Sequence, residues 1–461
     1  MATAREEMVL DVGAPAHGGH CVARPVGQPD GHVVFVRHAL PGETVRAVMT
    51  QKTSKTWRAE TVEVLAASPD RVRPAWAEAG AEGVGGGELS HVALPAQRTW
   101  KRWVLADCLR RIGGPEVAEA VAALTGQGSG PASVAVEAMP SEREAEASAD
   151  QRVRERAGTA TRTRVSLETT ADGRIGMHGF RSAEVKAVSS LPLAVREIQE
   201  LGLTERRRWR DLVRGSGRLS AVAPSGAEPV VVIDGQVYSS RGKPTGRKRV
   251  DEIVDATGLR LGELRYCVHA DGFWQVHRDA PGVLVDRVVR GALTGTLEGS
   301  SSRPGAVRAE GLKVLELYSG AGLFTLPLAS LGGEVRSLEG SEQAVRDARR
   351  NLHAFPGAHL FAGRVTPASV AELGRGFGEA GDQAADVVVL DPPRKGAGRA
   401  VVEAVADLGP RRVVLVACDP AAAARDLGAL LARGYSLASM CALDMFPHTH
   451  HFETLVVLDR D

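Results

Sequence analysis

Two apolar runs near the C-terminal end of the chain each stop at residues with reactive side chains. Residues 386–390 (Asp-Val-Val-Val-Leu) precede residues 391–396 (Asp-Pro-Pro-Arg-Lys-Gly), and residues 412–416 (Arg-Val-Val-Leu-Val) precede residues 417–420 (Ala-Cys-Asp-Pro). From residue 311 onward such runs alternate with glycine turns and helical segments, which predicts a doubly wound parallel sheet. Ligands of open α/β sheets bind outside the carboxyl ends of the strands. The sequence therefore predicts an α/β fold with a functional site at that edge.

A cofactor site is predicted at the first strand of this repeat. Residues 313–318 form a strand candidate, residues 319–322 (Ser-Gly-Ala-Gly) a tight turn, and residues 323–329 the start of a helix. Gly320 and Gly322 allow the backbone to approach a ligand closely. Glu339 ends the next strand candidate, where a carboxylate can hold two ribose hydroxyls. Because the full three-glycine dinucleotide fingerprint is missing, we favour S-adenosylmethionine over NAD.

A cysteine and a carboxylate suggest what is methylated. Carbon 5 of uracil is a poor nucleophile, but a thiolate that adds to carbon 6 makes carbon 5 able to attack a methyl group. A base must then remove the carbon 5 proton before the thiol is eliminated. Cys418 and Glu453 suit these two roles. Taken singly, Cys418 is equally typical of an inert buried cysteine, and Glu453 of a surface acid.

The 461 residues are enough for two or three domains. Short strand candidates with glycine-rich turns predict a small OB-like β-barrel over residues 1–66. Residues 67–260 are interpreted as a small α+β central domain, with a flexible insertion near 126–157 that is rich in Gly, Ser, Ala and Glu. Residues 261–461 form the cofactor-binding domain, and residues 295–310 are interpreted as a flexible linker within it.

Local basic clusters are the only charge signal, because the net charge is +1. Arginines crowd residues 206–210, and residues 241–249 carry arginines and lysines without an acid. Each cluster alone is typical of a solvated face. Two clusters ahead of a catalytic domain leave a solvated face and an RNA- or DNA-binding surface both open.

The cysteine pattern and the N-terminal residues bear on the cellular compartment of the protein. The five cysteines are scattered and odd in number, which argues against a disulfide framework and against a Cys-x-x-Cys metal site. The N-terminal residues have no apolar core of a secretory signal, and no apolar run approaches the roughly 20 residues that span a bilayer. We expect a cytoplasmic protein without a membrane partner, and a monomer.

Five motifs together resemble those of the uracil-5 RNA methyltransferases, which make 5-methyluridine in tRNA or ribosomal RNA. Residues 391–396 match the family's Asp-Pro-Pro-Arg-Lys-Gly without change. The other four are residues 273–277 (Phe-Trp-Gln-Val-His, for Phe-Phe-Gln-x-Asn), 316–322 (Glu-Leu-Tyr-Ser-Gly-Ala-Gly, for Asp-Leu-Tyr-Cys-Gly-x-Gly), 417–420 (for Ser-Cys-Asn-Pro) and 444–454 (for Asp-Met-Phe-Pro-Gln-Thr-His-His-Val-Glu-Thr). Residues 1–65 resemble the family's TRAM domain, an RNA-binding barrel.

The resemblance implies a Rossmann-like class I methyltransferase domain and a role for each matched residue. Cys418 would be the nucleophile and Glu453 the proton acceptor. Phe273 and Arg394 would contact the target base, and stacking of an aromatic ring on a flipped-out base is physically sensible. The residues that would hold S-adenosylmethionine are Gln275, Tyr318, Gly320, Gly322, Glu339 and Asp391.

The chain also departs from the family pattern. Many members bind an iron–sulfur cluster through four cysteines, whereas here Trp76, residues 84–87 (Val-Gly-Gly-Gly) and Leu191 stand near those positions. We therefore expect no cluster and no other metal. His277 and Asp419 each replace an asparagine, and both are expected near the base pocket, where they would bear on substrate choice.

Three alternatives remain at this stage. Asp-Pro-Pro turns also occur in methyltransferases of exocyclic amines, but an aromatic residue usually follows there, where this chain has Arg394. A metal site from Asp444, His448, His450 and His451 is disfavoured, because adjacent histidines on a strand point to opposite faces. The third alternative is an RNA-binding protein whose catalytic domain is inactive.

Overall fold

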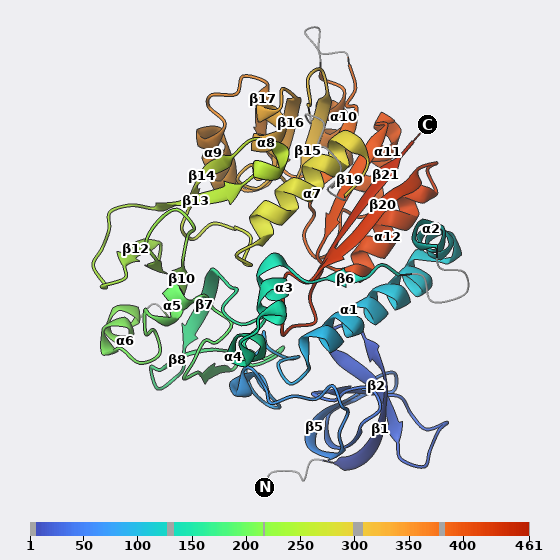
Figure 1. Ribbon diagram of the computed structural model, residues 1–461, viewed down its shortest axis with the longest axis vertical. Coiled ribbons are helices and arrows are strands. Elements are labelled where there is room, and N and C mark those ends of the chain that lie inside the picture. Colours follow the sequence, from blue (N-terminus) through green and yellow to red (C-terminus); the bar gives the residue numbers. More distant parts are fainter. Residues whose placement is uncertain (1–5, 127–132, 215–216, 298–307, 378–382, 461) are drawn as a thin grey trace.

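A computed structural model describes residues 6–126, 133–214, 217–297, 308–377 and 383–460. Figure 1 shows a barrel at the N-terminal end (blue), a central sheet (green) and a large C-terminal sheet covered by helices (orange and red). The barrel is closed in the order β1-β2-β3-β5-β4. Its strands are β1 (Glu7–Ala16), β2 (His20–Pro25), β3 (Val34–Arg37), β4 (Thr44–Lys52) and β5 (Trp57–Ala66). The barrel expected for residues 1–66 is thus present.

The central part contains a six-stranded sheet in the order β12-β11-β10-β7-β8-β9. The sheet strands are β7 (Arg164–Thr169), β8 (Ile175–His178), β9 (Val185–Ala187), β10 (Arg218–Val222), β11 (Val230–Ile233) and β12 (Gln236–Ser239). The short helices α5 (Arg196–Gln199) and α6 (Arg207–Val213) belong to the same region. Trp76, Val84 and Leu191, near the positions where the resemblance places cluster ligands, pack in one apolar cluster with the buried side of this sheet.

The C-terminal sheet has eight strands in the order β17-β16-β15-β18-β19-β21-β20-β6. They are β6 (Val136–Glu137), β15 (Lys313–Leu317), β16 (Glu334–Glu339), β17 (Ala358–Ala362), β18 (Val387–Leu390), β19 (Arg412–Ala417), β20 (Ser436–Leu443) and β21 (Glu453–Asp459). The strands β15 to β19 are parallel, as predicted, and β21 is antiparallel to both of its neighbours. The expected Rossmann-like α/β fold is confirmed.

Helices cover both faces of this sheet because the strands are apolar on both sides. Side chains alternate along a strand, so Val388 packs into the core on one face whereas Val387 and Val389 pack into the core on the other. The first core includes α1 (Leu94–Cys108), α2 (Pro115–Thr125), α10 (Pro367–Gly374), α11 (Arg399–Leu408) and α12 (Pro420–Leu431), and the second includes α7 (Ala280–Thr294), α8 (Thr325–Ser330) and α9 (Glu342–Asn351).

The strand register brings the residues with reactive side chains to one edge of the C-terminal sheet. Leu317 pairs with Leu390, and Leu390 with Leu415, so β15 and β18 end together and β19 ends close by, at Ala417. Ala417, at the end of β19, pairs with Thr454 near the start of the antiparallel β21. The residue that follows β19 and the residue that begins β21 therefore lie at the same edge.

Two expected boundaries differ from the structure. Residues 127–132 lie outside the described residues, but residues 133–157 contain β6, α3 (Pro140–Ala147) and α4 (Gln151–Glu155). Part of the expected insertion is built into the fold, because β6 pairs with β20 and Met139 is buried. The domain boundary expected at residue 260 falls inside the hairpin of β13 (Arg249–Asp255) and β14 (Glu263–His269), whose apolar residues join the core around α7. Most of the expected linker, residues 298–307, lies outside the described residues.

No helix in the described ranges combines the length and the apolar character that a membrane span requires.

Candidate active site

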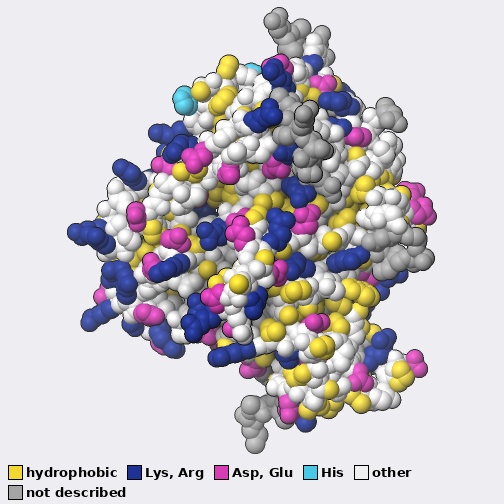
Figure 2. All heavy atoms as spheres, in the orientation of Figure 1, with side chains coloured by type: hydrophobic (Ala, Val, Ile, Leu, Met, Phe, Trp, Pro, Cys, Tyr) yellow, Lys and Arg dark blue, Asp and Glu magenta, His cyan; other side chains and the backbone are white. Residues whose placement is uncertain are grey.

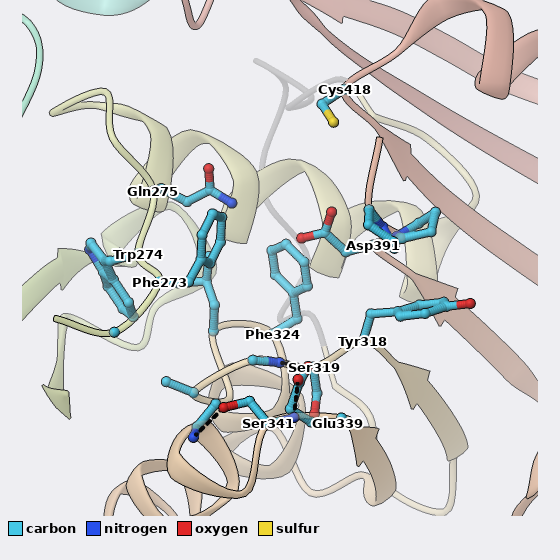
Figure 3. Close-up of a pocket in the computed structure, with 18 of the residues that line it drawn as sticks. Phe273, Trp274, Gln275, Tyr318, Ser319, Phe324, Glu339, Ser341, Asp391 and Cys418 are labelled. Atoms are coloured by element: carbon cyan, nitrogen blue, oxygen red, sulfur yellow. Dashed lines mark hydrogen bonds between the residues drawn. The ribbon is translucent and has the colours of Figure 1, made fainter. Parts of the chain in front are cut away.

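A pocket of about 770 Å³ opens at the carboxyl edge of the C-terminal sheet. It is lined by Phe273, Gln275, Tyr318, Gly320, Glu339, Asp391, Arg394, Cys418 and Glu453, among others. Nine of the ten predicted site residues thus lie around one cavity, and Gly322 lies in the turn beside it. Figure 3 shows Glu339 and Ser341 at one end of the pocket, Cys418 at the other, and Asp391 between them.

The turn after β15 brings backbone close to the pocket. Tyr318, Gly320 and Gly322 have φ angles of 65°, 55° and 87°, in the left-handed region that favours glycine. A Cβ on Gly322 would lie 3.0 Å from a methyl group of Leu352, so a larger residue is excluded there. Gly322 therefore shapes the turn, whereas Gly320 borders the cavity.

The Glu339 carboxylate is held by the backbone. Its Oε2 accepts a hydrogen bond from the Gly320 N–H (3.0 Å), and its Oε1 accepts one from the Ser341 N–H (2.7 Å). Bonds between a carboxylate and N–H groups are charge-assisted. They fix the oxygens at the end of β16, and the remaining lone pairs can accept from a pair of ligand hydroxyls.

Three acidic side chains, Glu316, Glu339 and Asp391, lie close together at the pocket. Burial, together with the charge of Glu339, raises the pKa of Asp391 to about 7. Burial also raises the pKa of Glu316, at the end of β15, to about 8, against the hydrogen bond that Thr325 donates to it (2.5 Å). Such a site favours a ligand that carries positive charge and hydroxyl donors, because both stabilise the ionised acids. S-adenosylmethionine, with its sulfonium and its ribose, has this chemistry.

The thiol and the carboxylate share the other end of the pocket. Cys418 directly follows β19 and is half-buried, and Glu453 begins β21 with 5% of its surface exposed. Burial, reinforced by Glu453 and Asp391, raises the pKa of Cys418 to about 12, whereas Arg394 lowers it. Burial and the neighbouring Asp391 raise the pKa of Glu453 well above its usual value. Glu453 Oε1 has no hydrogen-bond partner among the described residues.

Asp419 does not face the pocket, contrary to expectation. It is the N-cap of α12, where its side chain accepts a hydrogen bond from the Ala422 N–H (2.9 Å), and it also contacts His17 Nε2 of the barrel (2.9 Å). Burial opposes ionisation, yet the bond from His17 and the backbone N–H groups lower the pKa of Asp419 overall. Asp419 therefore caps the helix that follows Cys418 and connects that helix to the barrel.

His277 is also away from the cavity, so its expected place beside the base is wrong. Its side chain is 1% exposed, and its Nε2 lies 3.0 Å from Glu142 Oε1 of α3. Its Nδ1 accepts a hydrogen bond from the Asp279 N–H (3.1 Å). His277 therefore joins α3 to the start of α7 instead of bordering the pocket.

Phe446 and His451 line the pocket but were not predicted as residues of this site, since His451 was considered only for the disfavoured metal site. Both lie in the 444–454 motif, which ends at Glu453, and that position was the available signal. The other residues of the disfavoured metal site have protein partners: Lys101 Nζ donates to Asp444, Gln97 contacts His448, and Glu88 pairs with His450. Residues 447–452 are a loop and not a strand, so the strand argument against chelation does not apply there.

Comparisons with known proteins place the chain in a family. The sequence family described as tRNA (uracil-5-)-methyltransferase matches residues 306–461. An RNA methyltransferase of Streptomyces avermitilis described as uncharacterized is 36% identical, over 98% of both chains. The 23S rRNA (uracil(1939)-C(5))-methyltransferase RlmD of Alkalilimnicola ehrlichii is 30% identical, over 99% of this chain and 97% of its own.

The chain belongs to the RNA uracil-5 methyltransferase family. Enzymes of this family are S-adenosylmethionine-dependent RNA methyltransferases. The fold agrees with that of the Pyrococcus abyssi tRNA (uracil-54, C5)-methyltransferase, solved with S-adenosyl-L-homocysteine. The two share a TM-score of 0.62 and 21% identity, over 97% of this chain and all of the other.

Proposed function

We propose that this protein transfers a methyl group from S-adenosylmethionine to carbon 5 of a uridine in RNA, through a covalent bond between Cys418 and carbon 6. The observation that carries the proposal is the meeting of Cys418 and Glu453 in one pocket with the carboxylates Glu339 and Asp391. A thiol and a buried base are what pyrimidine carbon 5 chemistry needs. An amine methyltransferase would need no thiol there.

The cofactor end uses the residues of the turn and the two neighbouring strand ends. Glu339, fixed by two N–H groups, accepts the ribose hydroxyls, and Gln275, Tyr318 and Asp391 contact the rest of the cofactor. When bound, S-adenosylmethionine supplies an electrophilic methyl group and a positive charge. That charge stabilises the ionised forms of the acids and of the thiol, whose pKa values burial raises.

The reaction then runs through the two residues at the far end. The Cys418 thiolate would add to carbon 6 of the uracil, and the electron pair of the 5,6 double bond would bond carbon 5 to the methyl group as the methyl–sulfur bond breaks, with S-adenosylhomocysteine as the leaving group. The Glu453 carboxylate removes the carbon 5 proton, the double bond re-forms, and the thiolate leaves. Phe273, whose side chain is 77% exposed beside the pocket, supplies a stacking surface for the flipped base.

The RNA is proposed to be ribosomal. The Alkalilimnicola ehrlichii relative, which matches over 97% of its own length, is named a 23S rRNA methyltransferase. The likeness to the tRNA enzyme rests on 21% identity, which supports the fold alone. The first experiment therefore compares rRNA and tRNA transcripts as substrates.

The test measures transfer of labelled methyl groups from S-adenosylmethionine to unmodified 23S rRNA and tRNA transcripts, followed by nucleoside analysis. The wild type should yield labelled 5-methyluridine, Cys418→Ala should yield none, and Cys267→Ala should match the wild type. Cys267 is a fair control because it lies outside the pocket and its backbone N–H, not its thiol, bonds to Asn351. Binding of RNA without any transfer by the wild type would instead support the inactive RNA-binding alternative. Equal labelling by Cys418→Ala would exclude the mechanism.

A further inference from the structure

A second cavity, of about 520 Å³, adjoins the active site. It shares Arg394 and His451 with the first pocket, so the two cavities meet at these side chains. Most of its other wall comes from the central sheet and the loop after β8: Ser166, Glu168, Met177, His178, Gly179, Phe180, Arg181 and Arg218. Gly85 and Gly86, before α1, and His450, in the loop before β21, complete the wall. This volume is within the range of cavities that hold small ligands. Whatever enters it is a direct neighbour of the ligand beside Cys418.

The charge of this cavity is positive. Three arginines, Arg181, Arg218 and Arg394, line it. Among the described residues of its wall the one acid is Glu168, whose carboxylate is paired with His178 at 3.0 Å. Figure 2 shows further Lys and Arg side chains over the region that Figure 1 labels α6 and β12. An anionic ligand is therefore favoured.

Further basic side chains lie close to the wall of the cavity. Arg37, which pairs with Glu60 at 3.5 Å, lies over the Phe180 ring, 3.5 Å from its centroid, behind the wall. Burial and then the charges of Arg37 and Arg181 lower the pKa of the neighbouring His20 to about 3. Burial, His450 and Arg394 likewise lower the pKa of His451 to about 3. Both imidazoles thus stay neutral, and the arginines carry the positive charge.

The wall of the cavity has a charged part and an apolar part. Met177 and Phe180 form an apolar patch beside the arginines. Glycines at 85, 86 and 179 add no side chains. A Cβ on Gly18, in the β1–β2 loop of the barrel, would lie 3.2 Å from Arg181 Nη2, so the barrel lies directly beside Arg181. An apolar surface next to several arginines suits a base joined to a phosphate.

We propose that this cavity binds the nucleotide next to the target uridine in the RNA chain, with its phosphate on Arg181, Arg218 and Arg394 and its base against Met177 and Phe180. The inference rests on the proposed function, because the uridine beside Cys418 is what makes the occupant a neighbouring nucleotide. The cavity holds the RNA strand across the central sheet, and so positions the uridine in the active site.

The test is a binding measurement that needs no catalysis. Fluorescently labelled octauridylate is titrated with Cys418→Ala protein carrying Arg181→Ala or Arg218→Ala, and binding is followed by anisotropy at several salt concentrations. Each arginine variant should bind several-fold more weakly, and the slope of log affinity against log salt should become shallower by about 0.7, as expected for one lost phosphate contact on a single strand. Arg181 is exposed on a loop, so its variant keeps the fold.

Two controls make the result specific. Octauridylate with uncharged methylphosphonate linkages should bind the arginine variants and the parent equally. Arg196→Ala, at an exposed arginine of α5 outside the cavity, should leave both ligands unaffected. Unchanged affinity and salt slope in Arg181→Ala and Arg218→Ala would overturn the proposal, as would an equal loss in Arg196→Ala. Failure of the proposed function would appear separately, as absent methyl transfer by the wild type.

Discussion

Replacing Glu339 by glutamine tests how the cofactor end works. In the native site, both carboxylate oxygens accept backbone N–H bonds, from Gly320 and from Ser341. Glutamine has a single acceptor oxygen, so one of these N–H groups loses its partner and faces an NH₂ donor instead. An unsatisfied donor costs about 1–3 kcal/mol. The ribose hydroxyls lose a charged acceptor at the same time.

The expected result is a loss of cofactor affinity of about 10- to 100-fold, which corresponds to about 1.4–2.8 kcal/mol. The assay is calorimetric titration of Glu339→Gln with S-adenosylhomocysteine, compared with wild type at the same pH. Glu342→Gln is the matched control, because Glu342 is exposed on α9, where it pairs with Arg346 at the surface. Wild-type affinity in Glu339→Gln, or an equal loss in Glu342→Gln, would refute the role of Glu339.

Three further predictions concern the thiol, a buried ion pair and the metal content. Arg394→Gln should lower methyl transfer at neutral pH by about 3- to 10-fold and move the rising limb of the pH–rate profile to higher pH. The reason is that Arg394 favours the Cys418 thiolate, so its loss raises the pKa of the thiol. An unshifted limb, or the same shift in the exposed Arg399→Gln, would contradict this. Lys101→Met should destabilise the protein by about 3–5 kcal/mol in urea unfolding, because it leaves the buried Asp444 carboxylate unpaired. The double variant Lys101→Met/Asp444→Leu should recover much of that loss, and a single variant as stable as wild type would contradict the reasoning. The purified protein should show no visible iron–sulfur charge-transfer absorbance and contain no stoichiometric iron, because apolar packing occupies the region of Trp76 and Leu191; a coloured, iron-containing protein would be the contrary result.

The edge of the C-terminal sheet was predictable because parallel strands end together. Asp391 and Cys418 each follow an apolar run that could be recognised locally, and Glu339 ends another. The pairing of β21 with β19 then brings Glu453 to the same edge. Local patterns carry this information, since side-chain period and strand ends are properties of short segments.

Contacts between distant segments could not be predicted in this way. Asp419 contacts His17, 402 residues away, and His277 contacts Glu142, 135 residues away. The family resemblance placed both residues near the base, whereas their burial and partners depend on how the barrel and α3 pack. The composition of residues 126–157 predicted a flexible insertion, and this too differed because of a distant contact. The pairing of β6 with β20 joins residues that are far apart in the sequence.

The proposed bond between Cys418 and carbon 6 of the uridine can be tested directly. Wild-type protein is incubated with S-adenosylmethionine and a transcript that contains 5-fluorouridine, and the products are analysed by intact-protein mass spectrometry and peptide mapping. Fluorine leaves no proton at carbon 5 for Glu453 to remove after methyl transfer, so the thiol cannot be eliminated and the covalent intermediate persists. We predict a stable protein–RNA adduct that maps to Cys418 and is absent in Cys418→Ala. A preparation that methylates ordinary RNA but forms no adduct, or an adduct that persists in Cys418→Ala, would contradict the proposed mechanism.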